Sequence, residues 1–267
     1  MLSRITVIVF ILLVFAAITF SVVTGQNDEN TTNQNSSSQN IKSQPGQCVV
    51  ASQPEGNQKS QSLNPELPTI GVLVVDDVLL TEVAAPFDVF GKHDANGNQR
   101  FNVILIGKEQ RPYLSEEGLT LVADFSFSNA PPLTALIVPG AFQMQEILED
   151  QTIVNFVRKS GQDAEYLASN CAGAFLLGKS GLANNRKIVT YVGGGQVLRS
   201  TFPKLKVQND SNTTHVIDEN IISSNGNLTS YISALLVLEK MTDKSHRKYV
   251  ESQLYLNRLK KWNGELE

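Results

Sequence analysis

Cysteine, histidine and tryptophan are scarce in this chain of 267 residues, which has two cysteines, three histidines and one tryptophan. The cysteines, Cys48 and Cys171, are too few for a disulfide-stabilised scaffold or a cysteine zinc cluster. The histidines, His93, His215 and His246, lie far apart and lack the spacing of metal ligands. The sequence therefore predicts no metal site, and nothing in it indicates a cofactor.

Positive charge is also limited. Twenty-two Lys and Arg stand against 26 Asp and Glu, which gives a formal net charge of −4. Surfaces that bind nucleic acids carry clustered Lys and Arg, and no basic stripe occurs along this chain. We therefore expect no nucleic-acid partner.

Long apolar runs are absent except near the N-terminus. Residues 5–23 contain no charged side chain and follow Arg4. A run of about 19 residues lies between the lengths typical of a secretory signal and of a membrane-spanning helix. A buried core helix fits poorly, because a polar stretch follows at once. We expect residues 1–25 to be a signal peptide or an N-terminal membrane anchor, and the chain to be exported to the periplasm or the extracellular side.

The next segment, residues 26–67, is rich in Asn, Ser, Gln and Pro and almost lacks large apolar side chains. Such a segment cannot bury enough surface to offset its ordering entropy, so we expect a disordered polar linker. Cys48 lies within it. A disulfide from Cys48 to Cys171 is one alternative in an oxidising compartment, and an unpaired linker thiol is the other.

From residue 68 to residue 262, short apolar runs alternate with helical periodicity, which predicts one α/β domain. Ile70–Val75 is continuously apolar, as expected of a central parallel strand. Strands are expected at 70–75, 101–106, 135–138, 165–169, 187–190, 206–208, 215–217 and 221–224, a hairpin at 118–122, and helices at 82–93, 144–160, 172–179, 228–241 and 244–259. This alternation favours a doubly wound, mostly parallel sheet sandwiched by helices.

The segment around Cys171 is the most informative for chemistry. An apolar strand runs into Asn170-Cys171 and is followed by the small residues Ala172-Gly173-Ala174. A nucleophile at a sharp strand-to-helix turn, the nucleophile elbow, needs such small neighbours. The helix N-terminus there favours a thiolate, and the next backbone N–H groups face a developing oxyanion. The alternative is a buried structural cysteine, which is common.

Four blocks of sequence carry a resemblance to a known family. The segment 169–177 with Gly181-Leu182 resembles the elbow of the ThiJ/PfpI family (the DJ-1 superfamily), which has a flavodoxin-like, class I glutamine-amidotransferase-like fold. The segments 81–90, 137–141 and 216–226 resemble further blocks of the branch that contains isonitrile hydratases and the ligand domains of AraC-type regulators. The resemblance extends from Thr69 to Met241.

The resemblance implies roles for individual residues. Cys171 matches the family nucleophile, and Glu82 matches the acidic residue beside its sulfur, which donates or accepts a proton. The alternative for Glu82 is a carboxylate placed in the first turn of a helix for the helix dipole alone. Gly140 and Ala141 match the loop whose backbone amide helps to form an oxyanion hole, with Pro-Gly-Ala where Pro-Gly-Gly is usual.

Two departures from the family pattern bear on the reaction. Tyr191 stands where many members of this branch have a histidine, so a Cys-His pair is not available there. A tyrosine, with a pKa near ~10, is a poor general base at neutral pH. Ala172 stands where isonitrile hydratases tend to have a hydroxyl residue, which speaks against isonitrile hydration specifically. Ala172 and Tyr191 are expected to line the pocket.

The sequence thus favours an exported, cysteine-dependent hydratase or hydrolase acting on a small molecule, with Cys171 as nucleophile and Glu82 as proton donor or acceptor. A small-molecule-binding module and a redox or stress-response protein of the same fold are the alternatives. The resemblance implies a homodimer. A membrane contact is expected only through residues 5–23, if that segment is not cleaved.

Overall fold

The computed structural model of the protein describes residues 63–262. The apolar run at 5–23, Cys48 and most of the expected linker lie outside the described residues. Leu63–Leu67, at the end of the expected linker, lie within them, and the backbone N–H of Asn64 donates to Asn102 Oδ1 at 3.0 Å. Between residues 63 and 262, no helix combines the length and the apolar character needed to cross a membrane.

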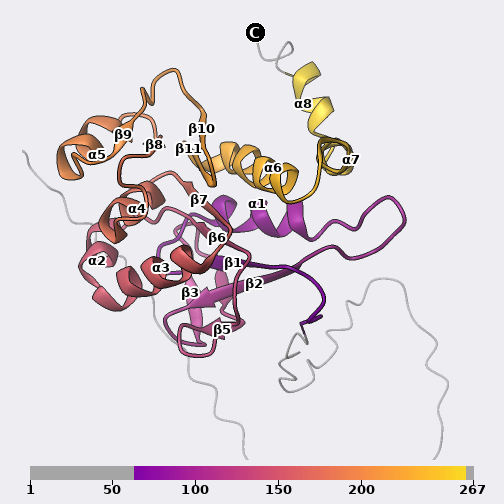
Figure 1. Cartoon of the computed structure of the whole chain (residues 1–267), viewed down its shortest axis with the longest axis horizontal. Helices are drawn as coiled ribbons and strands as arrows, with labels where there is room; N and C mark the ends of the chain where they lie inside the picture. The colour runs from indigo at the N-terminus through magenta and orange to yellow at the C-terminus, as the bar shows by residue number, and fades with distance from the viewer. Residues whose placement is uncertain (1–62, 263–267) are drawn as a thin grey trace, which may run out of the picture. The chain divides into compact units, whose positions relative to one another are not determined.

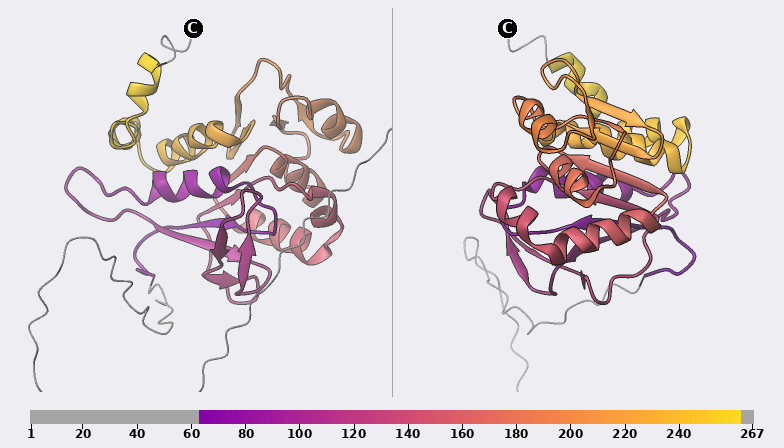
Figure 2. Two further views of the ribbon diagram at one scale, coloured as in Figure 1. Left: turned by 180° about the vertical axis from the view of Figure 1, so that it is seen from behind. Right: turned by 60° about the vertical axis from the view of Figure 1, so that its left-hand side comes forward.

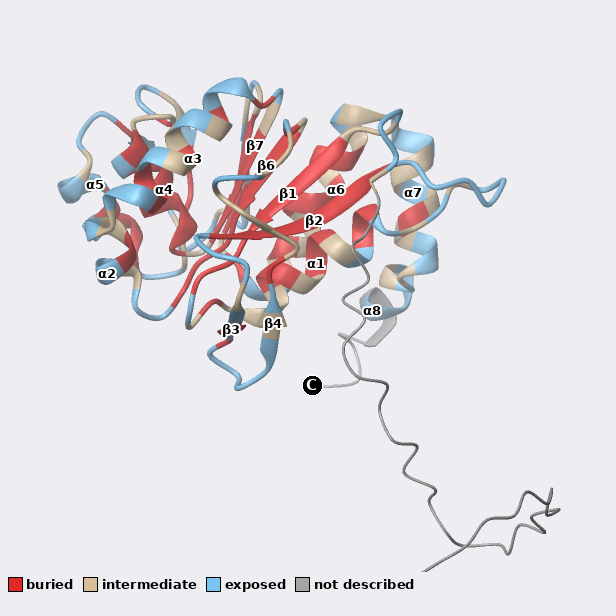
Figure 3. Cartoon of the chain, turned by 90° about the horizontal axis from the view of Figure 1, so that it is seen from below, coloured by how far each residue is buried: buried red, intermediate tan, exposed pale blue. Residues whose placement is uncertain are grey.

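The core element is a seven-stranded sheet in the order β10-β11-β7-β6-β1-β2-β5. All neighbouring strands are parallel except β10, which is antiparallel to β11. Its strands are β1 (Thr69–Leu73), β2 (Asn102–Gly107), β5 (Phe125–Ser126), β6 (Ala135–Val138), β7 (Tyr166–Asn170), β10 (His215–Asp218) and β11 (Ile221–Ser224). Every residue of β1, β2 and β6 is buried, as expected of continuously apolar strands covered on both faces (Figure 3).

Helices cover both faces of this sheet. α1 (Leu80–Phe90) and α6 (Ser230–Met241) lie side by side on one face, and α2 (Met144–Glu149), α3 (Gln151–Asp163) and α4 (Gly173–Ser180) lie on the other (Figures 1 and 2). The expected doubly wound α/β fold is therefore confirmed.

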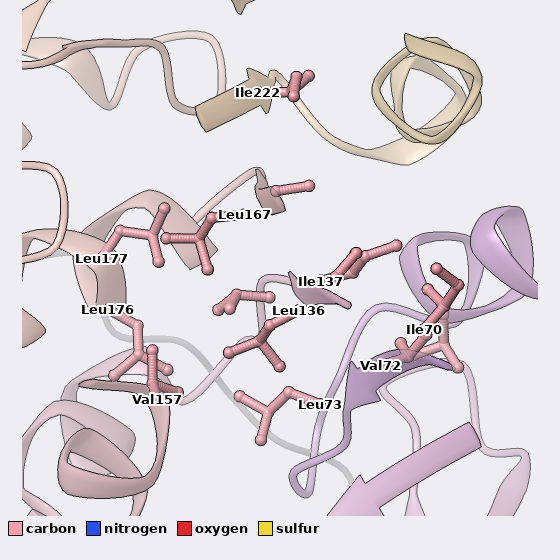
Figure 4. Close-up of a cluster of buried hydrophobic side chains, with 14 of the residues drawn as sticks. Ile70, Val72, Leu73, Leu136, Ile137, Val157, Leu167, Leu176, Leu177 and Ile222 are labelled. Carbon is pink, nitrogen blue, oxygen red and sulfur yellow. The ribbon is translucent and has the colours of Figure 1, made fainter. Parts of the chain in front are cut away.

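Alternating side chains of the strands fill the two sides of the core. Leu136 points toward Leu176 on α4, whereas the next residue, Ile137, points toward the opposite face (Figure 4). Both leucines and Ile137 are almost fully buried. Successive residues of a strand face opposite sides, so one apolar run supplies both halves of the core.

Two expected helices are each divided in the structure. The predicted helix 144–160 breaks at Asp150, whose side chain accepts hydrogen bonds from Thr152 N and Ile153 N and so begins α3. Asp is among the preferred residues at that position. The predicted helix 244–259 is α7 (Lys244–Gln253) and α8 (Leu256–Trp262), divided at Tyr255, which has a φ of 56°.

Smaller elements complete the domain. The expected hairpin is formed by β3 (Pro112–Leu114) and β4 (Thr120–Val122), which pair antiparallel. β8 (Lys187–Ile188) and β9 (Lys206–Val207) form a separate parallel pair on either side of α5 (Gly195–Thr201). A short 3₁₀ turn, η1 (Asn227–Thr229), leads into α6.

Candidate active site

The carboxyl ends of four adjacent strands, β11, β7, β6 and β1, bring together residues that are far apart in the sequence. Asn227 follows β11, Cys171 follows β7, Gly140 follows β6, and Glu82 lies in the first turn of α1, after β1. In doubly wound sheets, ligands bind beyond the carboxyl ends of the strands. The fold thus places the predicted nucleophile and acid at the edge where such sites occur.

Cys171 lies at a sharp turn between β7 and α4. Its φ is 51°, a conformation that is uncommon for residues other than glycine and costs about 1–3 kcal/mol. The turn is fixed on both sides, because Cys171 N donates to Ser224 O at 3.0 Å and Thr190 Oγ1 donates to the Cys171 carbonyl at 2.8 Å. This is the strand-turn-helix geometry of a nucleophile elbow.

Small residues are required around this turn. A Cβ added at Gly173 would lie 2.1 Å from the Val138 carbonyl oxygen, which excludes any side chain there. Gly226 has a φ of 89°, and a Cβ there would lie 2.4 Å from Cys171 Cβ and 2.2 Å from Glu82 Oε1. Gly173 therefore lets the start of α4 approach the end of β6, and Gly226 lets the loop after β11 approach Cys171 and Glu82.

Glu82 is fully buried beside the cysteine. Its Oε2 accepts from Gly140 N at 2.7 Å and its Oε1 accepts from Asn227 N at 3.0 Å. The Cys171 side chain lies beside the carboxyl group and lowers its pKa. Burial raises the pKa of Glu82 to about 7, against the opposing effect of these hydrogen bonds, and the charge of Glu117 adds to the rise. Glu82 therefore exchanges a proton near neutral pH.

The thiol of Cys171 is held in its protonated form. Burial raises its pKa to about 12, the negative charge and hydrogen bond of Glu82 add to the rise, and the backbone N–H of Ala172 opposes it. The backbone N–H at the helix N-terminus acts in favour of a thiolate, as expected from the sequence, but burial and the charge of Glu82 outweigh it in the resting site. Between these two pKa values the pair holds one proton, and it resides on the sulfur.

The loop after β6 supports Glu82. The Gly140 amide, expected in an oxyanion hole, donates to the Glu82 carboxylate, and Ala141 is buried and bridges antiparallel to Val78. The Gly140 N–H is therefore engaged in the resting site. The backbone N–H of Ala172 instead acts on the cysteine, because it lowers the pKa of the Cys171 thiol.

Tyr191 and Ala172 line one pocket. This pocket has a volume of about 650 Å³ and lies between α2, α4 and α5. The Tyr191 ring stacks on Phe175 of α4, with ring centroids 6.2 Å apart and an angle of 19° between the planes. Tyr191 thus presents an aromatic wall where a histidine would present a base.

Three residues that support the site were not predicted from the sequence. The backbone N–H of Asn227 donates to Glu82. Asn170 Oδ1 accepts hydrogen bonds from Ser224 Oγ and Ser233 Oγ, at 2.8 and 2.6 Å, in the buried layer beneath the elbow. Glu117, at the tip of the β3–β4 hairpin, accepts from Leu80 N at the start of α1. The only sequence signal was the turn-forming Asn-Gly-Asn at 225–227. Across residues 63–262, no group of three or more His, Cys, Asp or Glu is arranged to hold a metal ion.

Comparison with known proteins agrees with this geometry. A model of the DJ-1/PfpI family matches residues 68–240. The chain belongs to the DJ-1/PfpI family. The matched region begins just before β1 and ends in α6, so it contains the whole site.

Individual relatives are similar over part of their length. Isonitrile hydratase from Pseudomonas putida is 29% identical over 122 residues, which are 46% of this chain and 51% of that protein. The HTH-type transcriptional regulator GbdR from Pseudomonas aeruginosa is 22% identical over 167 residues, 62% of this chain and 44% of the regulator. The chain therefore spans about half the length of these curated relatives.

Solved structures share the fold. A ThiJ/PfpI family protein from Pseudomonas syringae has a TM-score of 0.63 at 21% identity, with 78% of this chain and 82% of that chain covered. Drosophila melanogaster DJ-1beta has a TM-score of 0.61 at 19% identity, covering 71% and 98%. An AraC family transcriptional regulator from Pseudomonas putida has a TM-score of 0.59 at 17% identity, covering 70% and 99%.

Proposed function

We propose that this DJ-1/PfpI protein is a cysteine-dependent enzyme of the hydratase or hydrolase type that acts on a small molecule. Cys171 is the nucleophile, and Glu82 is the proton donor and acceptor. The observation that carries the proposal is the burial of the Glu82 carboxyl group beside Cys171, where the backbone amides of Gly140 and Asn227 hold it, with the pKa of Glu82 raised to about 7. A group that titrates near neutral pH beside a nucleophile suits general acid–base catalysis.

The proton of the pair balances the reaction. The sulfur attacks an electrophilic carbon that is multiply bonded to nitrogen or oxygen, and the thiol proton moves to Glu82. A C–S bond forms, and the π bond breaks, so that its electron pair moves to the nitrogen or oxygen atom. Glu82 then protonates this atom. In the second half, Glu82 takes a proton from water, the hydroxide attacks the same carbon, and the C–S bond breaks. The sulfur keeps that electron pair and recovers a proton from Glu82.

The similarity to isonitrile hydratase supports a hydratase-type reaction, although it covers about half of that protein. Ala172 and Tyr191 differ from the pattern expected of that activity. We therefore propose the class of reaction and a class of substrate, small nitrogen- or carbonyl-containing compounds, and not one particular compound.

Two variants test the proposal on a panel of such compounds. Cys171→Ala should abolish turnover, and Glu82→Gln, which keeps the shape but not the proton exchange, should reduce it about 10²–10⁴-fold. Far-ultraviolet circular dichroism confirms that both variants are folded. Full activity in Cys171→Ala would rule out the nucleophile.

A second candidate is a small-molecule-binding module with little catalysis. The high pKa of Cys171 and the likeness to AraC-type regulators support it. A ligand bound equally well by the native protein and Cys171→Ala, with no turnover by either, would favour this candidate.

We also propose that residues 5–23 direct export of the domain, because the run is apolar, uncharged and preceded by Arg4. A reporter enzyme that is active only outside the cytoplasm, fused after residue 62, should be active. Deleting residues 5–23 should abolish that activity, whereas equal activity without them would contradict export. The homodimer implied by family resemblance is tested by light scattering of residues 63–262.

A further inference from the structure

The pocket beside the elbow has a mostly apolar lining. Leu148 of α2, Phe175 of α4 and Phe202, next to α5, line it together with Tyr191. Phe175 also lies edge-to-face with Phe202, with centroids 6.3 Å apart, so three aromatic rings form one continuous wall. A concave, mostly apolar surface of this kind favours the apolar part of a ligand, although it is open to solvent on one side.

The pocket reaches the reactive turn itself. Ala172, the residue directly after Cys171, is part of its lining, although only 9% of its surface is exposed. The backbone N–H of Ala172 lowers the pKa of the Cys171 thiol, so it acts on the sulfur. A molecule bound at the Ala172 end of the pocket therefore lies next to the reactive turn.

Charge in and around the pocket gives no advantage to an anion. Glu149 and Lys179, both exposed, contribute one charge of each sign to the lining. The backbone N–H of Gly193, in the glycine-rich turn that follows Tyr191, already donates a hydrogen bond to the Asp210 carboxylate. It is therefore not free to bind a phosphate group. A negative charge at the Cys171 end would also be repelled by Glu82 when it is ionised.

We propose that this pocket binds the aromatic group of a neutral small molecule and presents its electrophilic carbon to Cys171. Tyr191 is the specificity-determining residue, and its ring, packed against Phe175, carries the interaction. This inference rests on the proposed function only in taking Cys171 as the reacting group.

The test compares how fast neutral iodoacetamides alkylate Cys171 in the full-length protein. Each rate is divided by the rate of the same reagent with free glutathione, and peptide mapping by mass spectrometry separates Cys171 from Cys48. N-Benzyl-iodoacetamide should react at least about tenfold faster than N-methyl-iodoacetamide, because the pocket buries the ring. Iodoacetate, an anion, should be the slowest of the three.

Matched variants locate the effect. Val197→Asp should remove the benzyl preference, because Val197 lines the pocket, whereas Val122→Asp on β4 should keep it; the two valines are 53% and 52% exposed. Tyr191→Phe should keep the preference and Tyr191→Ser should lose most of it, since the ring and not the hydroxyl makes the contact. An equal rate for the two neutral reagents, or an unchanged preference in Val197→Asp, would overturn the inference.

The unreactive analogue N-benzylacetamide gives a second readout that does not depend on the thiol. Its NMR signals should broaden with the native protein and Val122→Asp, and not with Val197→Asp. Absence of broadening with the native protein would overturn the inference even if alkylation is too slow to measure. A clear benzyl preference without turnover of any compound would instead contradict the proposed function and leave the pocket inference standing.

Discussion

Glu82 and Cys171 lie beside each other next to Gly226, although 89 positions separate them in the sequence (171 − 82). The charge of Glu82 disfavours ionisation of the Cys171 thiol, because two negative charges in a buried site repel, whereas the neutral thiol lowers the pKa of Glu82. The backbone amides of Gly140 and Asn227 hold the carboxyl group in place, so its position depends on the folded loops after β6 and β11.

The close approach of Gly226 to this pair predicts a large effect of a single methyl group. Gly226→Ala should lower the free energy of unfolding by at least about 2 kcal/mol and reduce Cys171 reactivity, because its Cβ would collide with Glu82 and Cys171. Gly118→Ala is the control. Gly118 has a similar φ of 86° with nothing within 4 Å of the added Cβ, so a loss of about 1 kcal/mol is expected. Urea denaturation measures both, and equal losses would contradict the steric account.

The charge of Glu117 should change the pKa of Glu82 by electrostatics alone. Its carboxylate accepts from Leu80 N and raises the pKa of Glu82. Glu117→Gln keeps an acceptor oxygen and removes the charge, so the pKa of Glu82 should fall by less than about one pH unit. Carbon NMR of the Glu82 carboxyl group follows this titration. Glu116→Gln, on the neighbouring exposed residue, should shift it less, and a larger shift there would contradict a specific role for Glu117.

The fold followed from the sequence because its signals are local. Apolar runs such as Ile70–Val75 predict buried parallel strands, and the small residues around Cys171 predict a tight strand-to-helix turn. Contacts between distant loops are not encoded locally. Nothing near Glu82 in the sequence indicates that its oxygens bind the amides of Gly140 and Asn227, and burial by the assembled fold, which raises both pKa values, is likewise visible only in three dimensions.

The raised pKa of Glu82 also predicts how stability depends on pH. The folded state binds the Glu82 proton more tightly than the unfolded chain, so this contribution is fully present below the ordinary pKa of 4.5 and is lost as the pH rises through about 7. The difference corresponds to roughly 3 kcal/mol. Denaturant unfolding at intervals from pH 4 to pH 8 measures it. Glu82→Gln should lose less stability over this range than the native protein, whereas parallel curves would show that Glu82 does not titrate there.

Whether Glu82 controls the proton of Cys171 is tested most directly by the pH dependence of Cys171 alkylation by iodoacetamide, read by mass spectrometry in the native protein and in Glu82→Gln. We expect slow alkylation of the native protein up to high pH, because burial and Glu82 raise the pKa of Cys171 to about 12. In Glu82→Gln the reaction should accelerate at a lower pH, because the charge opposing the thiolate is gone. Superimposable profiles for the two proteins would contradict the claim that Glu82 governs the proton of Cys171.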